Sequence, residues 1–174
     1  KEANMSPDSK TVEDLKTAFS GESQANRRYL FFAEKADKDG YPQIARLFRA
    51  VAAAETVHAR KHFDVLAVAG ATKDNLAAAI AGEHYEFSEM YPSFIKDAQK
   101  DDNIKAEVGF SRASDVEKIH HELFEAAKRA LETRQEIKNE PYFVCGVCGY
   151  TVAGEAPEIC PICGAPRSRF TKVD

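Results

Sequence analysis

Two copies of the pattern Glu-x-x-His constrain this 174-residue chain more than any other feature of its sequence. They are Glu55-Thr-Val-His58 and Glu117-Lys-Ile-His120, and both lie in stretches with the apolar periodicity of a helix. Residues three apart share one face of a helix, so each pair can bind one metal ion. A single pair arises easily by chance. Two pairs, each with glutamates upstream, predict a dinuclear carboxylate site inside a helix bundle.

The apolar periodicity predicts four helices ahead of a cysteine-rich tail. We expect them at about 11–37, 42–69, 74–99 and 103–138. Pro92 falls inside the third and should bend or split it near Tyr91, either as a tolerated kink or as a bend that aims Glu89 at the metal site. The sequence therefore predicts an all-α bundle over residues 1–138 and a small second domain over residues 139–174.

Acidic residues occupy the core-facing stripes of these helices. Glu22, Glu55 and Glu117 each continue a series of apolar residues at helical spacing, and no Lys or Arg shares their stripes. An unpaired buried carboxylate costs several kcal/mol, and several together would exceed the roughly 5–15 kcal/mol net stability of a domain. Bound cations remove this cost, unless the stripes are mis-phased and the glutamates are solvated. Carboxylates with one imidazole per metal favour Fe or Mn over Zn.

The third helix offers more carboxylates than the site needs. Glu83, Glu86 and Glu89 are spaced by three, so any two neighbours could reach one metal ion. The separation between Glu22 and Glu86 in the sequence is nearly the same as the separation between the two Glu-x-x-His pairs. Glu86 is therefore the counterpart of Glu22 in an internal repeat. Spacing alone leaves both Glu83 and Glu89 open as the source of the extra carboxylate.

The tail contains a second metal motif. All four cysteines lie there, as two Cys-x-x-Cys-Gly pairs: Cys145, Cys148, Cys160 and Cys163. Two such pairs predict a tetrahedral sulfur site for zinc or a single iron, and from spacing alone a structural zinc ribbon is a full alternative. The tail is too short to fold on an apolar core alone. Metal binding must therefore contribute much of its folding free energy.

The net charge and the hydropathy of the chain exclude some classes of function. The net charge of −4 gives no electrostatic footprint for nucleic acid. No apolar run approaches the ~18 residues of a membrane span, and the first ten residues lack the apolar core of a signal peptide. We therefore expect a cytoplasmic protein with neither nucleic acid nor membrane as a partner, whose clustered cysteines bind metal rather than form disulfides.

These motifs together resemble the rubrerythrin family. The resemblance covers nearly the whole chain and rests on Glu22-Ser-Gln-Ala-Asn-Arg-Arg-Tyr29, the two Glu-x-x-His pairs, Glu86-Phe-Ser-Glu89-Met-Tyr-Pro92 and the cysteine tail. It implies a ferritin-like four-helix bundle with a di-iron centre, followed by a rubredoxin-like domain with one iron in the four-cysteine site. It also selects iron over zinc for the cysteines, and Glu89 over Glu83 for the extra carboxylate.

The resemblance further implies a non-haem peroxidase that reduces hydrogen peroxide to water in oxidative-stress defence. By position, Glu55 and Glu117 would bridge the two irons. Glu22 would bind the first iron, and Glu86 with His120 would bind the second. The rival functions are an iron-oxidising storage protein, which needs no attached one-electron relay, and a zinc-ribbon interaction protein, which the repeated buried glutamates disfavour.

The remaining implied roles concern exchange, proton donation and electron supply. His58 and Glu89 would exchange as ligands of the first iron between the reduced and oxidised states. Tyr29 and Tyr91 would line the site as hydrogen-bond donors. Electrons would pass through the four-cysteine iron from an external NAD(P)H-dependent reductase or a rubredoxin.

The connection between the second and third helices decides how such a bundle is assembled. A ferritin-like bundle runs these helices parallel, so the chain must return over roughly 38 Å at helical rise. Residues 70–74 reach at most about 18 Å. Unwinding the third helix through Gly82 would help, but the alanine-rich stretch 76–80 disfavours it. We therefore expect a domain-swapped homodimer, in which the first two helices of one chain meet the last two of the other.

Overall fold

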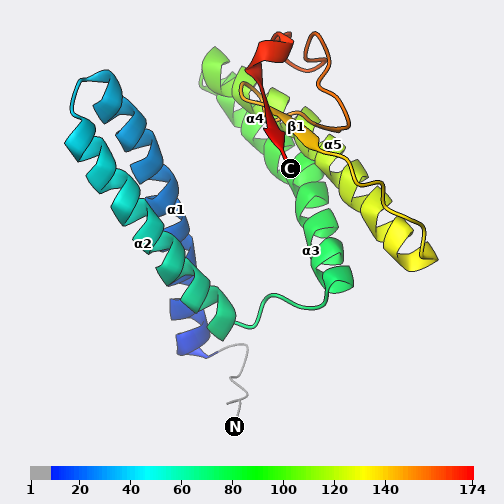
Figure 1. The fold of residues 1–174 in the computed structure, drawn as a ribbon, viewed down its shortest axis with the longest axis horizontal. Helices are drawn as coiled ribbons and strands as arrows, with labels where there is room; N and C mark the ends of the chain where they lie inside the picture. The colour runs from blue at the N-terminus through cyan, green and yellow to red at the C-terminus, as the bar shows by residue number, and fades with distance from the viewer. Residues whose placement is uncertain (1–8) are drawn as a thin grey trace. The chain divides into compact units, whose positions relative to one another are not determined.

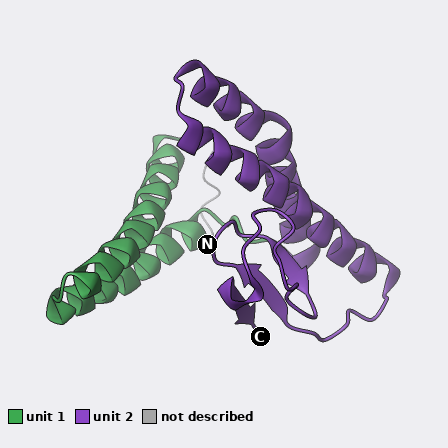
Figure 2. Cartoon of the chain, turned by 90° about the horizontal axis from the view of Figure 1, so that it is seen from above, with its two compact units in different colours: residues 1–70 green, residues 71–174 purple. Residues whose placement is uncertain are grey.

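The computed structural model describes residues 9–174, which form a series of helices followed by a small β-sheet (Figure 1). The helical elements are α1 (Lys10–Lys38), α2 (Pro42–Val65), α3 (Thr72–Tyr85), the π-helical turn η1 (Glu86–Met90), α4 (Tyr91–Lys100) and α5 (Ile104–Thr133). The chain divides into two compact units, one ending at Gly70 and the other beginning at Ala71 (Figure 2). No helix in the described part of the chain is long and apolar enough to span a membrane.

In the first unit, α1 and α2 lie side by side (Figure 1). They pair through small side chains. Ala33, Ala45 and Ala52 are almost completely buried, and Phe48 packs against the cluster that contains the first two. Alanines at the contact let the two helices approach closely. Among the described residues of this hairpin, nothing larger than Val12 is fully buried. The hairpin therefore has a tight seam but no substantial apolar core of its own.

In the second unit, α3, η1 and α4 together run alongside α5 (Figure 1). The predicted break in the third helix is confirmed. The N–H of Tyr91 bonds to the carbonyl of Glu86, five residues back, so one extra residue enters the turn before Pro92. Proline cannot donate a backbone hydrogen bond and clashes with the carbonyl four residues earlier, and a π-helical turn accommodates both constraints.

Several helix ends differ from the sequence expectation by a few residues. Helix α1 begins at Lys10 because the hydroxyl of Ser9 accepts a hydrogen bond from the N–H of Val12. Helix α2 ends at Val65, and α5 ends before Arg134, which takes a left-handed φ of 53°. Left-handed residues end helices efficiently, but without glycine at these points the sequence carries no clear stop signal.

The connection from α2 to α3 is short, as the sequence predicts. It covers residues 66–71, and α3 then begins at Thr72 and runs without interruption through Gly82. The alternative in which the chain unwinds through Gly82 is therefore wrong. The alanine-rich stretch stays helical. This segment therefore does not provide the chain with a return path over the length of the bundle.

The tail forms a three-stranded antiparallel sheet with strand order β2-β1-β3. Its strands are β1 (Tyr142–Cys145), β2 (Thr151–Ala153) and β3 (Phe170–Val173). Gly149 and Gly164 follow the two cysteine pairs with φ of 86° and 74°, a conformation that glycine adopts without strain. Strand β2 contacts α5 within the second unit. The predicted domain boundary between residues 138 and 139 remains a prediction, because the compact units separate at a different point, after Gly70.

Candidate metal centres

The four cysteines come together between two matching knuckles of the tail. Sγ of Cys145 lies 3.7 Å from Sγ of Cys163, and Sγ of Cys148 lies 3.6 Å from Sγ of Cys160. A tetrahedral metal with metal–sulfur bonds of about 2.3 Å places its sulfurs about 3.8 Å apart. The observed spacing fits a single tetrahedral ion without rearrangement.

The ionisation of these thiols also favours a bound cation. Burial opposes the ionisation of Cys145, but the N–H groups of Val147 and Cys148 point at its sulfur and lower the pKa of the thiol to about 7. Burial raises the pKa of the Cys148 and Cys163 thiols. Metals bind thiolates, so all four sulfurs ionise together only when a cation neutralises them. The module therefore has the donor chemistry of a four-cysteine metal site.

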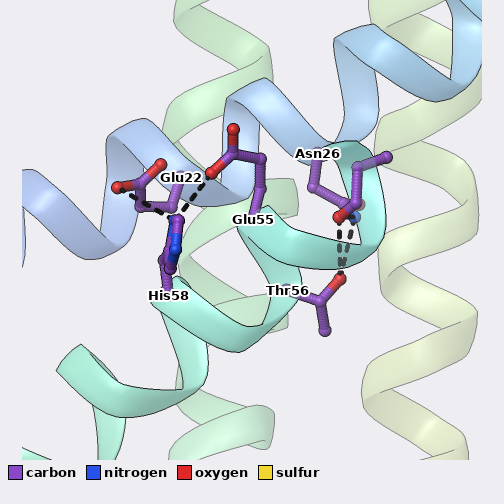
Figure 3. Close-up of polar contacts among 6 residues, drawn as sticks. Glu22, Asn26, Glu55, Thr56 and His58 are labelled. Atoms are coloured by element: carbon purple, nitrogen blue, oxygen red, sulfur yellow. Dashed lines mark hydrogen bonds and ion pairs between the residues drawn. The ribbon is translucent and has the colours of Figure 1, made fainter. Parts of the chain in front are cut away.

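The first carboxylate–histidine cluster lies between α1 and α2 (Figure 3). Nδ1 of His58 is 2.9 Å from Oε2 of Glu55 and 4.0 Å from Oε1 of Glu22. The three ligand atoms lie within 4.8 Å of one another. The structure thus brings together the three residues that the sequence assigns to this half of the site, which we call the α1–α2 half-site.

An asparagine fixes the two helices beside this cluster (Figure 3). Nδ2 of Asn26 donates to the carbonyl of Ala52 at 2.7 Å and to Oγ1 of Thr56 at 2.9 Å. Asn26 follows Glu22 by one helical turn, and Thr56 follows Glu55 directly. These bonds set the register of α1 against α2, and so they set the separation of the two carboxylates.

The second cluster lies between α3 and α5. Nδ1 of His120 is 2.8 Å from Oε2 of Glu117 and 3.7 Å from Oε2 of Glu83. These three residues, which we call the α3–α5 half-site, also have ligand atoms within 4.8 Å of one another. Glu117 and His120 were assigned from the sequence. Glu83 was left open by its spacing and set aside by the family resemblance, and the three-residue spacing was its only signal.

The α3–α5 half-site brings carboxylates close together, and the His120 ring offsets only part of their mutual repulsion. Oε2 of Glu83 is buried without a hydrogen-bond partner. Burial and the neighbouring Glu117 carboxylate raise the pKa of Glu83 to about 7, and the same two causes raise the pKa of Glu86. A buried carboxylate oxygen without a partner is costly, and a bound cation supplies both the partner and the opposite charge. The residues present therefore fit a metal centre.

The other residues assigned from the sequence take different positions. Glu86 lies in η1 close enough to Glu117 and His120 for their charges to shift its pKa, but outside the 4.8 Å cluster. Glu89 is exposed and also lies outside that cluster. Burial, followed by the carboxylates of Glu117 and Glu86, raises the pKa of Tyr91.

Tyr29 occupies an aromatic cluster of the first unit. Its ring centroid is 6.2 Å from that of Phe32 and 6.1 Å from that of Phe48. It projects from α1 about two turns beyond Glu22. Each half-site therefore has a tyrosine on its own hairpin, with Tyr91 beside the carboxylates and Tyr29 among aromatic rings.

Two Glu/His half-sites on helical hairpins, followed by a four-cysteine knuckle, define the class of di-iron carboxylate proteins with an attached rubredoxin-like module. Known families agree with this class. The rubrerythrin family model matches residues 13–128, and the rubredoxin-like domain model of rubrerythrins matches residues 143–171. The chain belongs to the rubrerythrin family.

Individual relatives are similar over almost their whole length. The chain is 39% identical to rubrerythrin-2 of Clostridium acetobutylicum, over 92% of this chain and 95% of the relative. It is 40% identical to nigerythrin of Nitratidesulfovibrio vulgaris, over 97% and 91%. A solved structure of fully reduced, all-ferrous nigerythrin matches with a TM-score of 0.56 and 39% identity, over 98% of this chain and 92% of that one.

The family confirms several expectations from the sequence. The fold class is a ferritin-like helical domain with a C-terminal rubredoxin-like knuckle. The cofactors of the family are a di-iron carboxylate centre and one iron in the four-cysteine site, and the Glu/His clusters and the four cysteines of this chain match them. Iron rather than zinc is therefore the metal of the four-cysteine site.

Proposed function

We propose that this protein is a non-haem di-iron peroxidase that reduces hydrogen peroxide to water in oxidative-stress defence. The observation that carries the proposal is the pair of Glu/His half-sites together with a four-cysteine module that contacts α5. When bound, the two irons supply the two electrons that, with two protons, convert one peroxide molecule to two of water. An attached one-electron relay is of use to a reductase, whereas iron storage has no need of one.

The carboxylates would divide between binding and bridging. In our proposal Glu55 and Glu117 would be the carboxylates shared by the two irons. Each lies beside the histidine of its own half-site, at 2.9 and 2.8 Å, where it could hold a metal ion. Glu22 binds the first iron, and Glu86 with His120 binds the second. The raised pKa of Glu86, caused by burial and by Glu117, supports its place beside this centre.

The exchangeable ligands would be His58 and Glu89. Both side chains are exposed in the single chain, so neither is fixed by its own hairpin. We propose that they alternate as ligands of the first iron between its reduced and oxidised states. Tyr91 keeps its proton, because its pKa is raised by burial and by neighbouring carboxylates, so it can donate a hydrogen bond to bound peroxide. Tyr29 has the corresponding role on the other hairpin.

The electrons would come from outside the chain. We propose an NAD(P)H-dependent reductase or a rubredoxin as the donor to the four-cysteine iron. A cytoplasmic location accords with this supply and with four cysteines kept for metal rather than for disulfides.

We further propose that the complete site forms in a domain-swapped homodimer. From Glu55 to Val65 and from Thr72 to Glu86, the helices extend roughly 15 and 21 Å from the ligands. The intervening connection reaches at most about 25 Å, which is too short for a return over both lengths. Exchange of hairpins between two chains removes this requirement. A protein that sediments as a monomer with a complete di-iron site would contradict the swap.

The activity can be tested by a single-turnover experiment. The protein is reduced without oxygen and mixed with stoichiometric hydrogen peroxide, while metal content and optical spectra are recorded. We expect the di-iron site to be oxidised rapidly by two electrons and then to regain one electron as the four-cysteine iron is oxidised; the second must come from an added donor. Peroxide that persists beside a fully loaded, reduced site would refute the peroxidase proposal.

A further inference from the structure

We propose that Thr151 is a positioning residue for His120, and that it acts from the four-cysteine module on the di-iron site of the same chain's α5. Oγ1 of Thr151 lies 3.1 Å from Nε2 of His120. The other ring nitrogen, Nδ1, faces Glu117 at 2.8 Å. The inference rests on the proposed function in one respect, namely that His120 binds iron through Nδ1.

The protons of this contact can be assigned from the hydrogen bonds. The hydroxyl of Thr151 has a single proton, and it donates this proton to the carbonyl of Gly149 at 3.0 Å. Toward His120, the hydroxyl oxygen of Thr151 can therefore only accept a hydrogen bond. A neutral imidazole that binds metal through Nδ1 has its proton on Nε2 and needs such an acceptor. Thr151 therefore selects the ring nitrogen that faces the carboxylates.

The backbone around Thr151 is held firmly enough for this role. Thr151 pairs with Val144 across the sheet, and the N–H of Gly149 bonds to the carbonyl of Cys145 at 2.9 Å. Gly149 also approaches α5 closely, since a Cβ built there would lie 3.7 Å from Cγ1 of Val116. Val116 is only 2% exposed. The knuckle and α5 therefore meet at a buried apolar side chain, one helical turn before the histidine.

The contact also joins the two metal centres through bonded atoms. Cys148 is linked covalently to Gly149, whose carbonyl accepts the Thr151 proton, and Thr151 in turn accepts from His120. The four-cysteine module thus reaches a di-iron ligand by one peptide and two hydrogen bonds. Among the described residues of α1 and α2, no hydroxyl makes a comparable contact with His58. The hydrogen bond that positions a histidine is therefore found in the α3–α5 half-site.

The test uses zinc-substituted protein, which is diamagnetic and has no peroxidase activity. At pH 8, proton and nitrogen NMR should detect a slowly exchanging Nε2–H of His120 with a cross-peak to Thr151 protons. Thr151→Ser should keep the slow exchange, and Thr151→Val should accelerate it about tenfold or more. Thr171→Val, the same change on β3, is the matched control and should leave it unaltered. Absence of the cross-peak in the wild-type protein, or slow exchange that survives Thr151→Val, would overturn the proposal.

A second measurement separates this inference from the proposed function. In iron-loaded protein after one turnover, Thr151→Val should slow the re-reduction of the di-iron site about tenfold, with the four-cysteine spectrum and iron content unchanged. Thr151→Ser should restore the wild-type rate. Equal rates in all three proteins would overturn the proposed link between the centres. A wild-type protein without peroxide reduction but with the protected Nε2–H would refute the peroxidase and leave the positioning role standing.

Discussion

The α1–α2 and α3–α5 half-sites use the same pattern of ligands in different surroundings. In both, a histidine contacts a glutamate three residues before it, and a glutamate from the partner helix completes the group. The side chain of His58 is nevertheless 52% exposed, whereas that of His120 is 26% exposed. The internal repeat has therefore preserved the Glu-x-x-His pair, whereas the glutamate from the partner helix and the surroundings differ, since Glu83 rather than Glu86 completes the second cluster.

This difference assigns different tasks to the two halves. His120 is held between Glu117 and Thr151, and its half-site contains the buried Oε2 atom of Glu83. The polar contacts of His58 within the described part of its hairpin are with the carboxylates of Glu22 and Glu55. A ligand that must move between redox states belongs where side chains are free, and a ligand that receives electrons belongs where it is fixed. The asymmetry thus matches the proposed exchange of His58 and the proposed link through Thr151.

The largest expected effect comes from removing either bridging carboxylate. Glu55→Ala and Glu117→Ala should each reduce peroxide turnover by at least about 100-fold, because each removes a ligand shared by both irons. The spectrum of the four-cysteine iron should remain. Glu122→Ala, at an exposed position of α5, is the matched control. Turnover is measured by peroxide consumption in pre-reduced protein, and persistent turnover in either variant would contradict the bridging assignment.

Those two variants should also restore each other in a mixed dimer. In a swapped dimer of one Glu55→Ala chain and one Glu117→Ala chain, one site receives both altered halves and the other receives two intact halves. Co-expressed chains with different tags, purified as heterodimers, should therefore regain one di-iron site and about half of the wild-type turnover. Unswapped chains would each contain one altered half. Heterodimers without any activity would contradict the swapped arrangement but would leave the assignment of the ligands unaffected.

Much of this asymmetric site could be predicted from the sequence, because helical spacing and ligand chemistry are local. The two Glu-x-x-His pairs, the break before Pro92 and the two cysteine knuckles all follow from residues close together in the chain. The position of Glu83 beside Glu117 and His120 could not be predicted, since three equally spaced glutamates differ only in how α3 and η1 face α5. The Thr151–His120 contact spans 31 positions and depends on docking of the sheet, which no periodicity encodes.

The histidines provide a more graded test of the comparison. His120→Ala should lose one iron per site and about 100-fold in turnover, because it removes the imidazole that is held between Glu117 and Thr151. His58→Ala should lose about tenfold, because Glu89 can supply a ligand in its place. Iron analysis and single-turnover kinetics measure both effects. Equal losses would show that the halves are functionally equivalent, and a greater loss for His58→Ala would reverse the proposed asymmetry.

The smallest expected effect is the pH dependence that Glu83 gives to the metal-free protein. Its pKa is raised from an ordinary 4.5 to about 7 in the folded chain, so folding favours its protonated form. Below the ordinary value the group is protonated in both folded and unfolded chains and contributes no cost. As pH rises toward 7, the unfolded chain releases this proton before the folded one, and stability falls.

The metal-free wild-type protein should therefore lose a few degrees of Tm relative to Glu83→Gln between about pH 5 and pH 7, at roughly 2–4 °C for each kcal/mol. Thermal unfolding followed by circular dichroism measures this difference. Zinc loading should remove it, because a cation beside Glu83 favours the charged carboxylate. Parallel curves for the two metal-free proteins would mean that Glu83 is solvated, and that the α3–α5 half-site is as open as its counterpart.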